Sequence, residues 1–197
     1  MAKSGPSVRA LLLTALIVTS GCQSLGSVVE RLDRDSGLTH VTDPSVAVYA
    51  RTETRFSRSA RDYIYLGPVE INERGTREYY LWVGIASTID RNFLSGEASV
   101  PDILYVDLAG APVEFELAPW DERIPRLAGR RIYDPAVKPD RIMAARVTRD
   151  QISLIARGRP DRVRVARTDQ PTTDYFLWGD PVEWPAFLSY AGLGQER

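Results

Sequence analysis

The amino-acid sequence predicts a mainly β protein, an antiparallel β-sandwich with two short helices in its C-terminal half. Short runs rich in β-branched and aromatic residues recur along the chain, separated by Gly, Pro, Asn and Asp. About seven such runs follow one another at the spacing typical of sandwiches. Two later segments carry helix-capping residues instead. A more open α+β sheet with both helices on one side is the alternative.

The predicted strands are identified by side chains that alternate between two faces and by the turn residues between the runs. They cover residues 45–52, 62–72, 76–88, 102–117, 141–147 and 161–168. Residues 72–75, NERG, form a hairpin-like connection in which Gly75 can supply a positive φ. Residues 107–110, DLAG, form a second turn before the returning strand PVEFEL. Both connections favour an antiparallel sheet.

The first predicted helix lies in residues 148–158. Thr148 can cap its N-terminus, and Gln151 stands three residues later as the partner of a capping box. Ile152 and Ile155 share one face, and Gly158 suits the left-handed C-terminal position.

The second predicted helix lies in residues 180–192. Asp180 can cap it, Pro181 suits the first helical position and Glu183 can complete the capping box. We expect Pro185 to bend this helix in the middle, because proline cannot donate a backbone hydrogen bond.

The first residues have the pattern of an export signal. Lys3 and Arg9 provide a basic head with no acidic residue, and ALLLTALIV follows as an apolar core. This run has about half of the roughly twenty apolar residues that a membrane-spanning helix needs. It suits a secretory signal peptide, and we expect residues 1–21 to be removed.

The residues that follow this core, VTSGC at 18–22, resemble the lipobox of bacterial lipoproteins. The resemblance implies that Cys22 is acylated, becomes the mature N-terminus and holds the protein at a membrane by its lipid. Cys22 is the only cysteine, and acylation would explain why an exported protein contains a single cysteine without a disulfide partner. Gln23 stands where lipoproteins kept at the inner membrane carry aspartate, so the resemblance implies the periplasmic face of the outer membrane.

The remaining chain divides into a tether and one domain. Residues 22–44 are largely polar and predict a flexible tether, and residues 45–197 predict a single β-rich domain. The apolar content of 44% is that of a globular protein. The formal net charge of −1 gives no electrostatic footprint for nucleic acid.

The usual catalytic and metal-binding constellations are missing from the sequence. His40 is the only histidine and falls in the predicted tether, where it makes a poor catalytic base. Zinc sites draw on several histidine or cysteine ligands, which this chain does not offer. We therefore expect no catalytic residues, no metal ion and no cofactor.

Acidic residues on the predicted strands leave one enzymatic alternative, a carboxylate-dependent hydrolase of envelope polysaccharide. Glu114 and Glu116 alternate with apolar residues and therefore share one face of their strand. Asp107 is a third candidate acid. A strand with one solvated face explains the same pattern and is the preferred interpretation.

Two groups of arginines are candidate contact surfaces for a partner. Arg162 and Arg164 share one face of a predicted strand and suit an anionic group, although a charged edge strand is the preferred explanation. The second group lies in an irregular loop with aromatic neighbours, a combination that protein interfaces favour. It consists of Arg123, Arg126, Arg130 and Arg131.

These observations together predict a non-enzymatic, lipid-anchored periplasmic lipoprotein that acts as a binding or assembly module. Its expected partners are the membrane, through the N-terminal lipid, and an envelope protein or a cell-wall component. No nucleic acid is expected.

Overall fold

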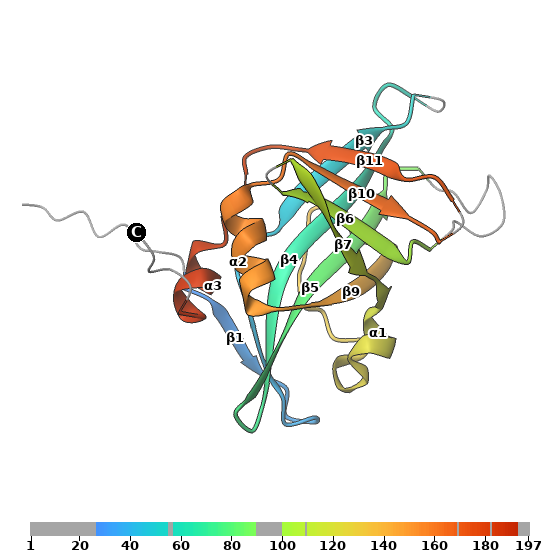
Figure 1. Cartoon of the computed structure of the whole chain (residues 1–197). Coiled ribbons are helices and arrows are strands. Elements are labelled where there is room, and N and C mark those ends of the chain that lie inside the picture. Colours follow the sequence, from blue (N-terminus) through green and yellow to red (C-terminus); the bar gives the residue numbers. More distant parts are fainter. Residues whose placement is uncertain are drawn as a thin grey trace, which may run out of the picture.

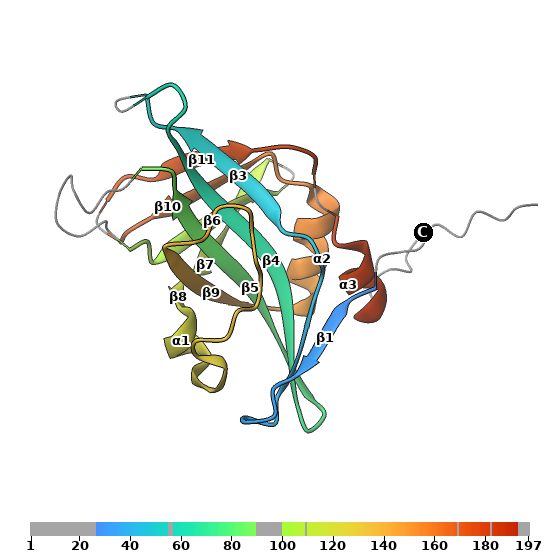
Figure 2. The ribbon, with the colours of Figure 1, turned by 180° about the vertical axis from the view of Figure 1, so that it is seen from behind.

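The computed structural model describes residues 27–54, 57–89, 100–108, 110–168, 170–181 and 183–192. Over these residues, eleven strands form one antiparallel sheet that nearly closes into a barrel, with three short helices packed against it (Figures 1 and 2). The mainly β prediction is confirmed. The arrangement is not clearly a sandwich, because the strands belong to one sheet that nearly closes on itself.

The sheet has the order β7-β6-β10-β11-β3-β4-β5-β9-β8, and the short pair β1 and β2 joins it through β4. The strands are β1 (Val29–Leu32), β2 (Thr39–Thr42), β3 (Ala47–Thr52), β4 (Arg61–Glu73), β5 (Thr76–Ser87), β6 (Ile103–Leu108), β7 (Ala111–Glu116), β8 (Ala118–Pro119), β9 (Arg141–Val147), β10 (Arg162–Ala166) and β11 (Thr173–Leu177). The helices are α1 (Trp120–Arg123), α2 (Arg149–Gly158) and α3 (Pro185–Tyr190), with a 3₁₀ turn η2 (Pro125–Leu127) after α1.

The long hairpin of β4 and β5 is the centre of the sheet. Its two-residue turn, Arg74 and Gly75, has positive φ at both positions, with values of 52° and 94°. Two left-handed residues give a turn whose twist matches that of the flanking strands, so the prediction for Gly75 is confirmed. The length of β4 lets it pair with β3 along residues 61–66 and with β2 along residues 69–72.

Two hydrophobic cores lie on opposite faces of this hairpin. The interior core fills the barrel with alternate strand residues such as Ile64, Leu81 and Val163, all fully buried. The outer core lies between the hairpin and the segment of residues 120–137, where Trp82 packs beside Tyr133 with ring centroids 5.1 Å apart. Burial on both faces explains why β4 and β5 are apolar along both sets of alternating positions.

One end of the barrel is covered by α2 and α3 (Figures 1 and 2). Helix α2 has the predicted capping box: Gln151 N donates to Thr148 Oγ1 at 3.1 Å, and Thr148 N donates to Gln151 Oε1 at 2.7 Å. Ile152 and Ile155 reach the interior core, as their shared face predicted. The αL residue at the C-terminus is Arg159 rather than Gly158.

The second predicted helix is shorter than expected. It begins at Pro185, which therefore occupies the first turn and does not bend the helix, and Asp180 and Glu183 lie outside it. A remote side chain replaces the predicted cap: Asp43, almost fully buried after β2, accepts a hydrogen bond from Phe187 N at 3.2 Å. A carboxylate at a helix N-terminus satisfies a free N–H group and complements the helix dipole.

The N-terminal boundary of the folded region also differs from the prediction. Residues 29–42, expected in the tether of residues 22–44, form β1 and β2 of the sheet. Leu38 and Val41 are buried, so this segment contributes to the cores. His40 is likewise buried in β2 and does not lie in a tether. The export signal and Cys22 fall outside the described residues.

Candidate binding pocket at the barrel end

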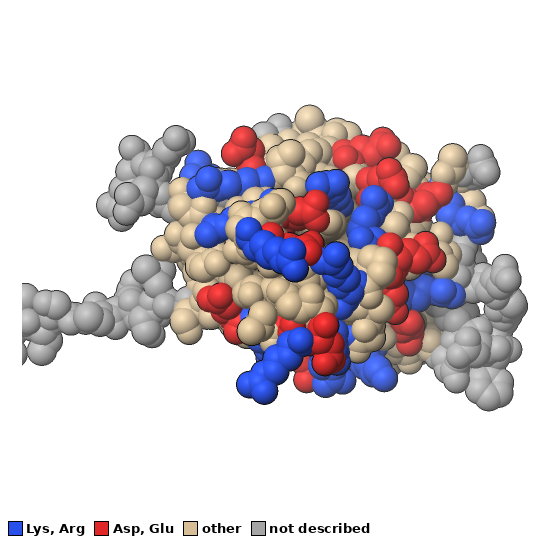
Figure 3. Space-filling model, turned by 90° about the horizontal axis from the view of Figure 1, so that it is seen from below, with Lys and Arg blue, Asp and Glu red and all other residues tan. Residues whose placement is uncertain are grey.

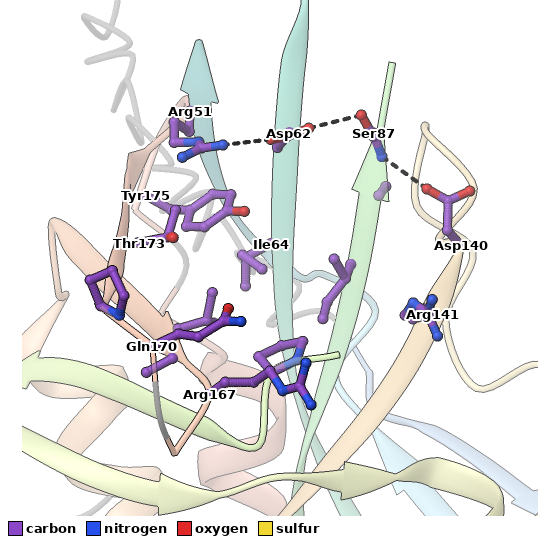
Figure 4. A pocket seen from close by; sticks show the side chains of 16 residues that line it. Arg51, Asp62, Ile64, Ser87, Asp140, Arg141, Arg167, Gln170, Thr173 and Tyr175 are labelled. Atoms are coloured by element: carbon purple, nitrogen blue, oxygen red, sulfur yellow. Dashed lines mark hydrogen bonds and ion pairs between the residues drawn. The ribbon is translucent and has the colours of Figure 1, made fainter. Parts of the chain in front are cut away.

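A hollow of about 210 Å³ opens at the end of the barrel opposite α2 (Figure 4). Helix α2 connects the last residue of β9 to the first of β10, whereas the hollow lies at Arg141, where β9 begins, and at Ala166, where β10 ends. Further walls come from β3, β4, β5 and β11. The volume equals roughly seven water molecules, enough for a compact ligand.

The floor of the pocket is the end of the interior core. Ile64 is fully buried, and Val165 and Tyr175 are nearly so. Each projects inward from its own strand, because alternate residues of a strand point to the same face. Below these side chains the interior core fills the barrel, so the pocket is closed at its base.

One wall is a connected row of polar side chains from three strands and a loop. Asp62 on β4 accepts hydrogen bonds from Arg51 Nη2 at 3.2 Å and from Ser87 Oγ at 2.8 Å. Ser87 N in turn donates to Asp140 Oδ2 at 3.2 Å. Figure 4 shows this row from Arg51 to Asp140 along the rim of the pocket. Such networks hold their members in one geometry.

Arg51 is held by several contacts besides the one to Asp62. Its Nη2 atom also donates to Glu53 Oε2 at 2.8 Å, and its guanidinium carbon lies 5.8 Å from the centre of the Tyr175 ring. Its Nε atom is buried and has no hydrogen-bond partner among the described residues. A buried donor without an acceptor is costly, so this atom marks a place for an acceptor.

The rest of the rim carries exposed polar groups. Arg141 on β9, Arg167 after β10 and Gln170 in the loop before β11 line the mouth. Figure 4 shows these side chains and the Tyr175 hydroxyl arranged round the hollow, with Ile64 behind them. The pocket thus combines an apolar floor with a polar, arginine-containing rim.

No pattern in the sequence singles out this pocket, because its walls come from six strands spread over residues 51–175. Of the arginines that line it, only Arg167 lies close in sequence to Arg162 and Arg164. Alternation places Arg51 and Asp62 on inward-facing positions of their strands, where charged residues are uncommon. That is the one local signal that could have indicated them.

The predicted arginine loop lies elsewhere, near the β4–β5 hairpin turn and the β1–β2 connection. Its four arginines are ion-paired to four different parts of the chain. The pairs are Arg123–Glu116 at 3.0 Å, Arg126–Glu73, Arg130–Asp33 at 2.6 Å with Arg130–Asp35, and Arg131–Asp134 at 3.1 Å. Figure 3 views this side of the molecule and shows acidic and basic side chains interleaved. The loop is thereby joined to neighbouring elements.

Arg123 and Arg126 also border an open groove between this loop and the β4–β5 hairpin. Apolar residues such as Ile71 and Ile124 form its base, with Arg74 and Glu78 on its rim. Two of the four arginines of the loop thus lie beside a groove with an apolar base, while the charges of all four are paired within the chain.

Arg162 and Arg164 share one face of β10, as predicted, and both bind Asp107 on β6. Arg162 Nε lies 2.7 Å from Asp107 Oδ2, and Arg164 Nη2 lies 2.8 Å from Asp107 Oδ1. The alternative of a charged edge strand is wrong, because β10 pairs with β6 on one side and β11 on the other. The two arginines stabilise a cross-strand pairing.

The three acids considered for a hydrolase do not lie in this pocket. Glu114 and Glu116 are exposed on the outer face of β7, while Phe115 between them is buried. Burial raises the pKa of Asp107, but hydrogen bonds from Arg162 and Arg164 outweigh it and hold that pKa below its ordinary value. A general acid at neutral pH needs the opposite shift.

No helix among the described residues is long and apolar enough to span a bilayer. No group of three or more His, Cys, Asp or Glu side chains in that part of the chain is arranged to hold a metal ion.

Comparison of this chain with protein families, with curated proteins and with solved structures found no match.

Proposed function

We propose that this chain is a lipid-anchored lipoprotein of the bacterial envelope, without catalytic activity, that binds an envelope component in the pocket at its barrel end. The observation that carries the proposal is the pocket itself, a cup of about 210 Å³ with a buried floor and a rim of fixed polar groups. Binding sites for small ligands commonly have this form, and mouths of barrels are a frequent place for them.

The arrangement of the chain suits an anchored receptor. β1 begins at Val29. Burial is the main cause that raises the pKa of Tyr190 in α3, and the charges of Glu70 and then of Glu30 in β1 raise it further. Glu30 therefore lies near α3. The chain thus enters the domain beside α3, at the end of the barrel that the helices cover (Figures 1 and 2). A lipid on Cys22 would then be attached to the domain at the end opposite the pocket, which lies at Arg141 and Ala166.

The anchor is tested by expressing the full-length precursor in a bacterium with two membranes and measuring the mass of the mature N-terminus. We expect an acylated Cys22 and recovery in the outer-membrane fraction. Cys22→Ser should release the protein or leave it unprocessed, whereas Ser24→Ala is the matched control and should change neither result. A mature chain that begins with an unmodified Cys22 would disprove the lipoprotein assignment.

The pocket is tested by cross-linking cells that express the tagged full-length chain and identifying what co-purifies. Gln170→Trp places a large side chain at the mouth, and Thr172→Trp places the same side chain at a neighbouring exposed position that does not line the pocket. We expect a defined envelope component with the wild type and with Thr172→Trp, and its loss with Gln170→Trp. Recovery of the same partners by all three proteins would contradict the proposed site.

A further inference from the structure

We propose that the outer face of β11 contacts the surface of the membrane in which the chain is anchored, through the exposed side chains of Phe176 and Trp178. The inference rests on the proposed function, since it needs the lipid on Cys22. Its support is a pair of exposed aromatic residues on one strand, together with the place at which the chain enters the domain.

Five large apolar side chains are exposed among the residues that the structure describes, and only two of them are close together on one strand. Leu32, Ile142 and Leu154 lie on three different elements, β1, β9 and α2. Phe176 is 57% exposed and Trp178 is 50% exposed, and they stand two positions apart at the end of β11. Single exposed apolar residues are ordinary, whereas adjacent ones indicate a contact surface.

Both aromatic side chains point outward from the barrel. Tyr175 and Leu177, which alternate with them, pack in or against the interior core. Trp178 N donates to Val48 O at 2.8 Å, so the pairing with β3 continues to this residue. The side chain of Trp178 therefore lies on the same outer face as that of Phe176.

The surface beside this pair is also apolar. Ala50 of β3 lies opposite Phe176 in the register, and Tyr63 of β4 lies opposite Ala50. Ala50 is buried and Tyr63 is half-buried. The apolar area thus extends from β11 over two neighbouring strands, which Figure 1 shows side by side.

Charged groups near the pair have contacts within the chain. The guanidinium carbon of Arg61 lies 4.7 Å from the centre of the Trp178 ring, and its Nη1 atom donates to Ser59 O at 3.2 Å. This cation–π contact holds the indole ring in place. Asp174, on the same face of β11, lies 3.8 Å from Arg162. At a membrane surface the charged ends of such side chains stay in water while the aromatic rings are buried.

The anchor lies within reach of this surface. Cys22 precedes Val29, where β1 begins, by seven positions, which span at most about 25 Å. Val29 pairs with Thr42, and six positions later Val48 accepts the hydrogen bond from Trp178, a path of at most roughly 30 Å. Figures 1 and 2 show that β11 leads toward α3, beside which β1 begins. The lipid and the aromatic pair can therefore meet one membrane surface together.

A membrane suits this surface better than a protein partner does. Tryptophan and phenylalanine favour the boundary between lipid headgroups and hydrocarbon. The exposed parts of two aromatic side chains come to roughly 250 Å², well below the about 800 Å² that each partner buries in a stable protein interface. A small contact is enough at a membrane, because the lipid anchor keeps the domain at a high effective concentration beside the bilayer.

Lipid quenching of tryptophan fluorescence tests the contact. The acylated full-length protein is reconstituted into vesicles of phosphatidylethanolamine and phosphatidylglycerol, with or without bromine on the acyl chains near the headgroups. Trp82, Trp120 and Trp184 are almost fully buried, so a quencher in the membrane should act on Trp178. We expect lower emission in the brominated vesicles, and Trp178→Phe should abolish this difference.

Two further variants locate the contact on the domain. Phe176→Ser should weaken the quenching of Trp178, because it removes part of the apolar contact. Leu154→Ser removes an equally exposed apolar side chain from α2 and should leave the quenching unchanged. Thermal unfolding of each variant checks that the fold is kept. Quenching that responds to Leu154→Ser and not to Phe176→Ser would put the helices on the membrane and overturn the inference.

The remaining outcomes separate this inference from the proposed function. Flotation of the vesicles shows whether the chain is bound to them. Flotation without quenching overturns the contact and leaves the lipoprotein assignment standing, whereas a chain that has no acyl group and does not float overturns both. A dimer in detergent that Phe176→Ser dissociates, measured by analytical ultracentrifugation, would also overturn the contact, because a second copy would then cover the pair.

Discussion

The hydroxyl of Tyr133 donates a hydrogen bond to the backbone carbonyl of Pro68 at 2.6 Å, across 65 residues of sequence. The ring lies directly over Gly67, where an added Cβ would come within 2.5 Å of the ring. Burial raises the pKa of this tyrosine well above its ordinary value, so it stays a donor at all ordinary pH values. This contact holds the irregular segment after η2 against the outer face of the barrel.

Gly67→Ala should lower the free energy of unfolding by about 1–3 kcal/mol, because the added methyl group overlaps a buried ring that has little room to move. Urea denaturation monitored by tryptophan fluorescence measures the change. The effect should depend on the ring, so in a Tyr133→Ala background the same glycine substitution should cost much less. Equal losses in the two backgrounds would show that the close approach of Tyr133 is not the cause.

Thr148→Ala should lower the free energy of unfolding by about 1 kcal/mol, because it removes the side-chain acceptor of the capping box at the start of α2. Chemical denaturation measures this directly. Thr172→Ala, at an exposed position in the loop before β11, is the matched control and should change stability little. A Thr148→Ala protein as stable as this control would mean that packing of α2 against the core makes its cap redundant.

Features that depend on near neighbours could be predicted from the sequence. The turn at Gly75, the capping box of Thr148 and Gln151, and the solvated face of Glu114 and Glu116 all follow from residues within a few positions of one another. Each involves a backbone conformation or a periodicity that local chemistry determines. For this reason they agree with the structure in detail.

Features that depend on distant partners could not be predicted from the sequence. β1 and β2 are four residues each and largely polar, and β2 is recognisable as a strand only beside residues 69–72 of β4. The cap of α3 comes from Asp43, more than a hundred residues away in the sequence. The start predicted for that helix from the nearby Asp180 and Glu183 was therefore wrong. Closure of the sheet is a property of all its strands and leaves no mark in any one of them.

The candidate site shows the same division. Arginines that are close in sequence, such as Arg162 and Arg164, were easy to group, and the structure engages both with Asp107. The arginines of the pocket are far apart in sequence and meet only because the end of β3, the beginning of β9 and the end of β10 lie at the same rim. Clusters along a sequence therefore indicate charged surfaces more readily than they indicate a pocket.

Asp107→Asn should lower the melting temperature, because Arg162 and Arg164 lose the charge that both of them bind. The pKa of Asp107 is held below its ordinary value of 3.8, so its ionised form stabilises the folded state. That contribution is complete above this value and is lost as the pH falls through the folded-state pKa. The difference in melting temperature between wild type and variant should therefore be full near about pH 6 and shrink below about pH 4.

Glu114→Gln is the matched control for that measurement, since this carboxylate is exposed on the neighbouring strand β7. It should leave the melting temperature nearly unchanged at both pH values. A pH-independent difference for Asp107→Asn would show that the contact is held by shape and hydrogen bonding and not by charge.

His40 should make the stability of the protein depend on pH in a mildly acidic range. Burial in β2 lowers its pKa below the ordinary value of 6.5, and the charge of Arg31 lowers it further, while Asp33 opposes this effect. The unfolded chain therefore takes up a proton at a higher pH than the folded protein does. Stability is complete above about pH 6.5 and declines as the pH falls, because protonation favours the unfolded state.

Urea denaturation at about pH 7.5 and about pH 5.5 measures this decline, which lies above the range in which Asp33, Asp102 and Asp107 titrate because their pKa values are all lowered. His40→Gln keeps a side chain of similar size without the titrating group, so its free energy of unfolding should change less between the two pH values than that of the wild type. If both proteins lose the same stability, another group is responsible and the pKa of His40 does not differ between the folded and the unfolded chain. A smaller loss in the variant would identify His40 as the residue that sets the acid side of the stability profile.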